Sequence, residues 1–162
     1  MARRPTINGP YTVARLPAWD VRLHAYIEET KTQARVWGQT DCAIWSMGAV
    51  DAMCGSVLAD EFRGQYDDPI SARAYLTARG WGNLRDAVIE CVGPELPGGA
   101  THVTMGDLIY TPTDDGLGGL GVLLGRVILP NHDAPGVRTV LLEAVMRLGG
   151  CVIQLGDESC PA

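Results

Sequence analysis

Hydrophobic positions near the start of the chain recur at helical spacing. Over residues 18–36 an apolar residue returns every three or four positions, which predicts an amphipathic helix with Asp20 as its cap. The apolar stripe consists of Trp19, Leu23, Tyr26 and Ile27. A stripe of this kind is typical of core packing and carries no chemistry by itself.

The next segment is apolar on nearly every side. Only two strongly polar residues, Ser46 and Asp51, interrupt residues 43–54. A helix of this composition is expected to be central and largely buried. It would begin at Asp41 or Cys42, after a polar turn, and end at Gly55, a residue suited to the C-terminal position of a helix.

Three shorter helical patterns follow the apolar segment. They cover residues 58–64, 70–80 and 83–92. Asn83 is placed to cap the last of them, and Gly93-Pro94 would stop it. The N-terminal half of the chain is therefore predicted to be mostly helical.

The composition changes after this point. Residues 95–104 are rich in Gly and Pro and predict a loop, and short apolar runs typical of strands follow. The predicted strands are 107–110, 120–124, 126–129, 137–142 and 151–155. Residues 139–148 could equally form a short helix. Helices followed by a small antiparallel sheet define the α+β class.

The bulk numbers favour one folded domain. The chain has 162 residues, of which 46% are hydrophobic and 20% charged, the balance of a folded soluble protein. Pro and Gly punctuate the start of the chain, so we expect an irregular arm over residues 1–17. A single domain over 18–156 and a short tail over 157–162 complete the predicted organisation.

The charge excludes some partners. A net charge of -6 and a pI of about 4.9 disfavour non-specific binding of nucleic acid, whose phosphates would be repelled. No apolar run is long enough for a membrane span, and the first residues lack the pattern of a signal peptide. We therefore expect synthesis in a cytoplasm and no contact with nucleic acid.

The five cysteines do not suggest a disulfide framework or a metal site. None forms a C-x-x-C pair, and the number is odd. Three of them, Cys54, Cys91 and Cys151, are expected to be small core residues, and Cys160 has no assigned role. Asp114-Asp115 predicts a turn, and no further metal ligands are apparent around it. No cofactor is expected.

Cys42 is the best candidate for chemistry. It follows the polar turn Trp37-Gly38-Gln39-Thr40-Asp41 at the predicted start of the apolar helix. The positive end of a helix favours a thiolate, which is the nucleophilic form of cysteine. Asp41 is expected to cap the same helix.

The order of these parts resembles a known enzyme family. A helix-borne cysteine after Asp41, the run Gly106-Asp107-Leu108-Ile109-Tyr110 and a second strand that ends in Gly125 are similar to NlpC-type cell-wall cysteine peptidases. These peptidases have a papain-like architecture. The resemblance implies a cysteine helix packed on a small antiparallel sheet.

A more specific resemblance covers about residues 20–130. The motifs Trp37-Gly38-x-x-Asp41-Cys42 and Arg63-Gly64-x-Tyr66, then the Gly80 turn and Gly106-Asp107, resemble a tailed-phage protein family related to those peptidases. Genes of that family and its relatives tend to lie among those for the tail tip, including in gene transfer agents.

The resemblance also implies a catalytic apparatus. In the peptidases the cysteine attacks the peptide carbonyl, and a histidine at the start of the second sheet strand takes its proton. Cys42 matches the nucleophile. The histidine position falls on Gly119, or on Leu120 if the register differs by one, and neither residue can accept a proton.

Three histidines could replace the missing base. His132, in the turn after the strand 126–129, is the best substitute, because the residue that orients the histidine in the family comes from that region. His24, within the first predicted helix, and His102, in the loop before Gly106, are weaker alternatives.

Three functions follow from these observations. The missing histidine favours a catalytically inactive structural component of a phage or gene transfer agent tail tip or baseplate, located in the virion and bound to tail hub and distal tail proteins. The alternative is an active cysteine peptidoglycan endopeptidase of the tail tip that uses Cys42 and His132. A small cytoplasmic binding protein unrelated to phage remains a third hypothesis.

Overall fold

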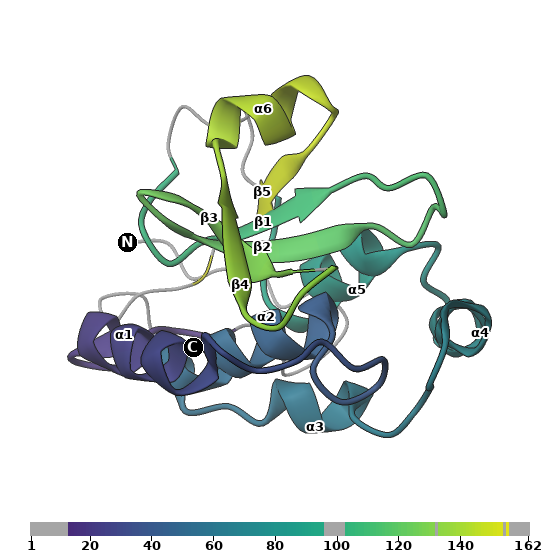
Figure 1. Ribbon diagram of the computed structural model, residues 1–162, viewed down its shortest axis with the longest axis horizontal. Coiled ribbons are helices and arrows are strands. Elements are labelled where there is room, and N and C mark those ends of the chain that lie inside the picture. Colours follow the sequence, from purple (N-terminus) through teal and green to yellow (C-terminus); the bar gives the residue numbers. More distant parts are fainter. Residues whose placement is uncertain (1–12, 96–102, 132, 154, 156–162) are drawn as a thin grey trace.

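The computed structural model describes residues 13–95, 103–131, 133–153 and 155 (Figure 1). Helices come first: α1 (Trp19–Thr30), α2 (Cys42–Cys54), α3 (Leu58–Phe62), α4 (Pro69–Ala78) and α5 (Leu84–Cys91). Strands follow, with one short helix among them: β1 (Leu108–Thr111), β2 (Gly119–Leu124), β3 (Arg126–Pro130), β4 (Val137–Val140), α6 (Leu142–Arg147) and β5 (Cys151–Ile153). The predicted α+β class is confirmed.

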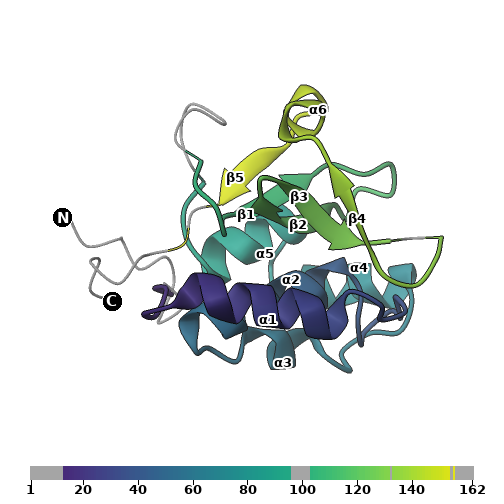
Figure 2. The same cartoon turned by 60° about the vertical axis from the view of Figure 1, so that its left-hand side comes forward.

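The strands form one antiparallel sheet in the order β4-β3-β2-β1-β5. Helices α1, α2 and α3 lie on one side of the sheet and α6 lies on the other (Figure 2). Side chains alternate along β2 between the two sides, since Leu120 and Val122 belong to the large helical core while Leu123 packs in the smaller cluster with Val145 of α6.

Helix α2 is the centre of the helical layer, as its composition predicts. Eight of its thirteen residues are buried, and none is exposed. Gly48 allows α1 to approach closely, because a Cβ there would lie 2.4 Å from the Tyr26 hydroxyl oxygen. The Tyr26 hydroxyl donates to the carbonyl of Trp45 at 2.7 Å, and the Trp45 indole donates to Thr30 at 2.8 Å. These bonds fix the two helices against each other.

Helix α1 is shorter than the apolar stripe suggests. It ends at Thr30 rather than Val36, because the carbonyls of Lys31 and Gln33 accept hydrogen bonds from the start of β4. The expectation that Asp20 caps α1 is wrong. The N-cap is Ala18, in the left-handed conformation, and it makes no side-chain cap bond.

The chain between residues 137 and 148 contains both predicted alternatives. It is a strand up to Val140 and a helix from Leu142. The predicted helices over 58–64, 70–80 and 83–92 are present with bounds that differ by one or two residues, and Asn83 caps α5 by accepting from the N–H of Asp86.

Residues 13–17 of the predicted arm pack on the C-terminal end of α2. The N–H of Leu16 donates to the carbonyl of Met53 at 2.9 Å, and Arg15 pairs with Asp107 at 2.8 Å. Residues 1–12 and the predicted tail over 157–162 lie outside the described residues. Across the described ranges, no helix has the length and apolar character needed to cross a membrane.

Candidate functional site

The N-terminus of α2 is held by one buried carboxylate. Asp41 is 2% exposed, and one of its oxygens accepts from the N–H groups of Ala43 and Ile44 at 3.0 and 3.1 Å. Its other oxygen accepts from the N–H of Gly38 at 2.8 Å. Asp41 is therefore the helix cap that the sequence predicts, and it also fixes the turn before the helix.

Two motifs that are far apart in sequence meet at this turn. Gly38 has a φ of 73°, and a Cβ there would lie 1.7 Å from the carbonyl oxygen of Tyr66. The Gly38 carbonyl in turn accepts from Gly64 at 2.9 Å. The rings of Trp37 and Tyr66 meet edge to face with centroids 6.3 Å apart. The structure thus brings the Trp37–Cys42 and Arg63–Tyr66 segments together.

Cys42, the first residue of α2, borders a cavity of about 100 Å³. The other walls come from α3, α4 and α5, from the loop between β1 and β2, and from β3 and β4. Apolar residues that line it are Trp37, Phe62, Tyr66, Leu76, Leu84, Leu117 and Leu129. The Cys42 side chain is half-buried.

The surroundings of Cys42 keep its thiol protonated. Burial raises the pKa of Cys42, and the neighbouring Asp41 carboxylate raises it further. A backbone hydrogen bond from Leu120 and the charge of Arg35 act in the opposite direction without overcoming the rise. The expectation that the helix N-terminus favours a thiolate here is therefore wrong, because burial outweighs the helix dipole.

The start of β2 lies against the Cys42 sulfur. The backbone of Leu120 is near enough to lower the pKa of the thiol, and Gly119 lines the same cavity as Cys42. These are the two positions that the resemblance assigns to the base, and neither side chain can take a proton.

None of the described residues that line the cavity is a histidine. His24 is on the exposed face of α1, with its Nδ1 atom 2.8 Å from the carbonyl oxygen of Asp20. His102 and His132 lie outside the described residues. The role of His132 as a base accordingly stays a prediction.

Tyr66 is the other ionisable group beside Cys42. Burial raises the pKa of Tyr66 far above its ordinary value, and the charge of Asp41 and a hydrogen bond to it add to the rise. Its phenol is therefore neutral and can donate a hydrogen bond but cannot act as a base.

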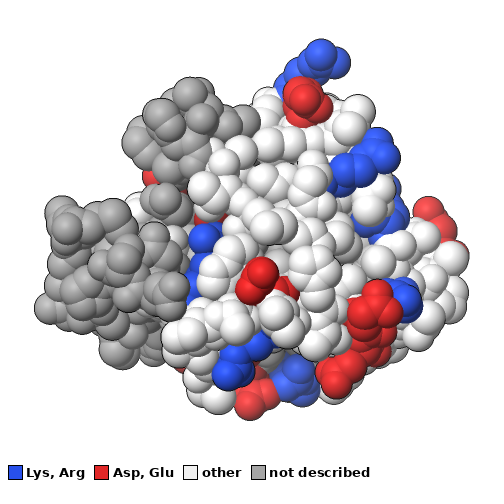
Figure 3. Space-filling model, turned by 90° about the vertical axis from the view of Figure 1, so that its left-hand side faces the viewer, with Lys and Arg blue, Asp and Glu red and all other residues white. Residues whose placement is uncertain are grey.

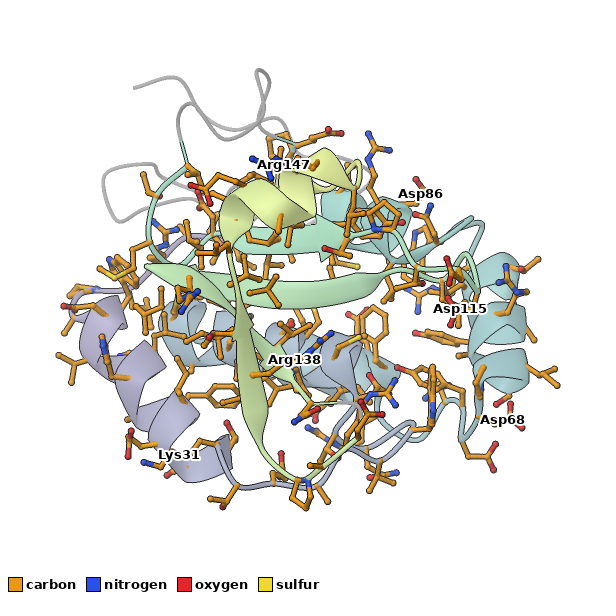
Figure 4. The ribbon with its side chains drawn as sticks, turned by 45° about the horizontal axis from the view of Figure 1, so that its top comes forward. Lys31, Asp68, Asp86, Asp115, Arg138 and Arg147 are labelled. Atoms are coloured by element: carbon orange, nitrogen blue, oxygen red, sulfur yellow. The ribbon has the colours of Figure 1, made fainter. Side chains whose placement is uncertain are left out.

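Two arginines that the sequence did not single out line the cavity. Arg35 lies over the Trp37 ring at 4.6 Å, and its Nε is buried without a hydrogen-bond partner among the described residues. Arg138 is an exposed residue of β4 (Figure 4). A cation–π pair at i and i+2 is the only sequence signal that could have marked Arg35.

Asp115 lines the cavity from the loop between β1 and β2, where Figure 4 shows it beside α4. One of its carboxylate oxygens accepts from the N–H of Leu117 at 2.9 Å and from the Thr113 hydroxyl at 2.5 Å. Its backbone carbonyl accepts from Arg73 of α4. Asp115 thus forms the turn that was predicted for Asp114-Asp115.

Gly106 and Asp107 belong to a separate structural site. Asp107 is fully buried, pairs with Arg15, and accepts from the N–H of Thr104 at 2.9 Å. Burial raises the pKa of Asp107, while Thr104 and Arg15 lower it. A Cβ on Gly106 would lie 2.7 Å from the Trp19 ring. Asp107 thus anchors the turn before β1.

The remaining cysteines and carboxylates of the described chain form no second candidate functional site. Cys91 and Cys151 are buried as predicted, Cys54 is half-buried at the end of α2, and Cys160 lies outside the described residues. Within the part of the chain that the structure describes, no three His, Cys, Asp or Glu residues are grouped so as to hold a metal ion.

Fold and site together define a small α+β domain with a cavity at the N-terminus of its central helix. The chain belongs to the family described as Domain of unknown function (DUF6950), which it matches over residues 14–148. No curated protein and no solved structure matches the chain.

Proposed function

We propose that this protein is a non-catalytic domain of papain-like, NlpC-type architecture that serves as a structural component of a phage or gene transfer agent tail tip. The observation that carries the proposal is that Gly119 and Leu120, at the start of β2, lie beside Cys42 and that neither side chain can take a proton. In an active enzyme of this design that place holds the imidazole that activates the sulfur.

Three further observations support a loss of catalysis. Burial and the Asp41 carboxylate raise the pKa of Cys42, which disfavours the nucleophilic form. The neighbouring Tyr66 is neutral and cannot take the proton. Asp41, the nearest carboxylate in sequence, already accepts three backbone hydrogen bonds. Its oxygens are used to hold the turn and the helix.

The tail-tip role rests on the resemblance of the Trp37–Cys42 and Arg63–Tyr66 motifs to a tailed-phage family. The close packing of these two motifs gives both a shared structural purpose, since they build one wall of the cavity. The expected partners are tail hub and distal tail proteins, and the expected location is the virion.

One observation favours the alternative of an active peptidoglycan endopeptidase. A cavity adjoins the Cys42 sulfur, and a substrate could reach the thiol through it. This alternative requires His132 as the base, and the two proposals therefore differ in one measurable property.

An assay of cell-wall hydrolysis distinguishes the non-catalytic proposal from the endopeptidase alternative. Purified protein, Cys42→Ala and His132→Ala are compared by zymography on bacterial cell walls, with an active NlpC-type peptidase as the positive control. We expect no clearing by any of the three proteins. Clearing that disappears in both variants would overturn the non-catalytic proposal in favour of the endopeptidase.

Location is tested on purified particles. Quantitative mass spectrometry of intact and tail-less particles should find the protein at a fixed number of copies per intact particle. Its absence from intact particles would refute the tail-tip role while leaving the conclusion about catalysis in place.

A further inference from the structure

A second hollow shares two wall residues with the cavity beside Cys42. It is a groove of about 310 Å³, and Trp37 and Tyr66 line both the groove and the cavity. The remaining walls of the groove are polar or glycine: Gln39, Gly64, Gln65, Asp67 and Ser71. A polar groove next to an apolar hole matches an extended peptide, whose backbone needs hydrogen bonds and whose side chain needs an apolar site.

The cavity has the size and lining for one apolar side chain. Its volume of about 100 Å³ is somewhat smaller than the roughly 150 Å³ of a dry engineered cavity that takes up benzene. Its floor is formed by buried side chains such as Phe62, Leu76 and Leu117. Because the thiol of Cys42 is neutral, the sulfur adds to this apolar lining instead of repelling it.

Two arginines and two carboxylates line the cavity. Asp41 and Asp115 are both engaged in hydrogen bonds of their own turns. Neither Arg35 nor Arg138 has an ion-pair partner among the described residues, and these two guanidinium groups are the charges that a ligand carboxylate could pair with. At the groove, in contrast, Asp67 contributes a negative charge. A bound carboxylate would therefore lie near the two arginines and away from Asp67.

The face shown in Figure 3 carries a mixed set of charges, with acidic and basic side chains that in several places lie side by side. An apolar cavity with two guanidinium groups that lack ion-pair partners among the described residues is a more specific feature than a mixed surface of this kind.

We propose that this cavity and groove bind an extended segment of a different protein, through one apolar side chain followed directly by a carboxylate residue. The apolar side chain enters the cavity beside Cys42, the backbone lies in the groove, and the carboxylate pairs with Arg35 and Arg138. This inference rests on the proposed function, because a non-catalytic site can hold such a segment without cleaving it.

Short capped peptides test the chemistry of recognition. Binding of N-acetyl-Leu-Glu-amide, N-acetyl-Leu-Gln-amide and N-acetyl-Ala-Glu-amide to the full chain is followed by amide chemical shifts in NMR titrations. We expect weak binding of the first peptide with shifts at Trp37, Leu117 and Leu120. The Gln peptide should bind about two- to fivefold more weakly, as expected for one lost exposed ion pair. The Ala peptide should bind at least about fivefold more weakly, because its side chain buries less apolar surface.

Three variants locate the site. Arg138→Gln should weaken binding of the Leu-Glu peptide about fivefold, while Arg126→Gln, the same change at an exposed β3 position outside the cavity, should leave it unchanged. Gly119→Leu should abolish binding by occupying the cavity, since a Cβ at Gly119 has only ordinary contacts at 3.9 and 4.0 Å. Thermal unfolding checks that each variant is folded.

Several outcomes would overturn the inference. These are equal binding of the three peptides, shifts away from the cavity, or equal effects of Arg126→Gln and Arg138→Gln. A concentration-dependent dimer that Arg138→Gln abolishes would assign the groove to a second copy of the chain and also overturn it. Failure of the proposed function is a different result, since it would be seen as Cys42-dependent clearing of cell walls.

Discussion

At both ends of α2 an aspartate accepts hydrogen bonds from backbone N–H groups, but only the N-terminal end borders the cavity beside Cys42. At the C-terminal end, Gly55 adopts a left-handed conformation, and Asp51 accepts from Ser56 and from the N–H groups of Leu58 and Ala59. Leu16 then packs against Gly55. Polar groups are satisfied there, and residues 13–17 cover part of this end of the helix.

At the N-terminal end, a buried carboxylate again satisfies the backbone, but the surface stays open. Asp41 accepts three N–H bonds, as Asp51 accepts two N–H bonds and one from a hydroxyl. Here no segment of the described chain fills the cavity beside Cys42, and the two arginines that line it have no ion-pair partner among the residues that the structure describes. Both helix ends are therefore equally well capped. The cavity at the N-terminal end cannot be explained by a missing cap.

Removal of a charged side chain should lower the free energy of unfolding more at the C-terminal end of α2 than at its N-terminal end. Asp107→Ala would leave Arg15 buried at 7% exposure without its partner, and we expect it to lower the free energy of unfolding by about 3–5 kcal/mol. Urea denaturation measures the change. Asp60→Ala, which removes an exposed ion pair with Arg63, is the control and should cost about 0.5 kcal/mol or less. Equal effects of the two substitutions would mean that the Arg15 contact does not hold residues 13–17 in place.

At the N-terminal end of α2, loss of the capping carboxylate should reduce stability less and should make the Cys42 thiol more reactive. Asp41→Ala removes the acceptor of three backbone N–H groups, two of them at the start of α2, and should cost about 2–3 kcal/mol. Asn83→Ala, which removes the single capping bond of α5, is the control at about 1 kcal/mol. Because Asp41 raises the pKa of Cys42, Asp41→Ala should also shift thiol alkylation to lower pH. An unchanged alkylation profile would contradict the assigned cause.

A smaller effect is expected when an imidazole is introduced at the start of β2. Gly119 lines the same cavity as Cys42, and a Cβ there meets only ordinary contacts, so Gly119→His should lower the apparent pKa of Cys42 by providing a nearby cation. Thr139→His, an exposed β4 position outside the residues that line the cavity, is the matched control. Alkylation rates measured against pH should change only in the first variant. The same shift in both would show that Gly119 is not the position of a missing base.

The sequence predicts the elements well where hydrophobic periodicity decides them. The apolar residues of α2 and the short strands have no other way to be buried, so their positions follow from pattern alone. The early end of α1 does not, because the carbonyls of Lys31 and Gln33 are taken by β4, which lies about 100 residues further along the chain.

The site was predicted in part for the same reason. The place of Cys42 at the start of α2 and the Asp41 cap are local features of one turn, and both were predicted from the sequence. The raised pKa of Cys42 depends on burial beneath β2, and the Arg15–Asp107 pair joins residues 92 positions apart. Arg35 and Arg138 meet the cavity only after the sheet is placed on the helices. Each of these depends on tertiary contacts that no local pattern specifies.

The pH dependence of Cys42 alkylation tests the central claim most directly. Iodoacetamide labelling of Cys42 is followed by peptide mass spectrometry from pH 5 to 10 in the native protein and in His132→Ala. Because the folded-state pKa of the thiol is raised, we expect labelling to rise only at pH values above the ordinary thiol pKa of about 8.5, with identical profiles for both proteins. An inflection below neutral pH that His132→Ala removes would contradict the account, since it would show an imidazole acting on the sulfur.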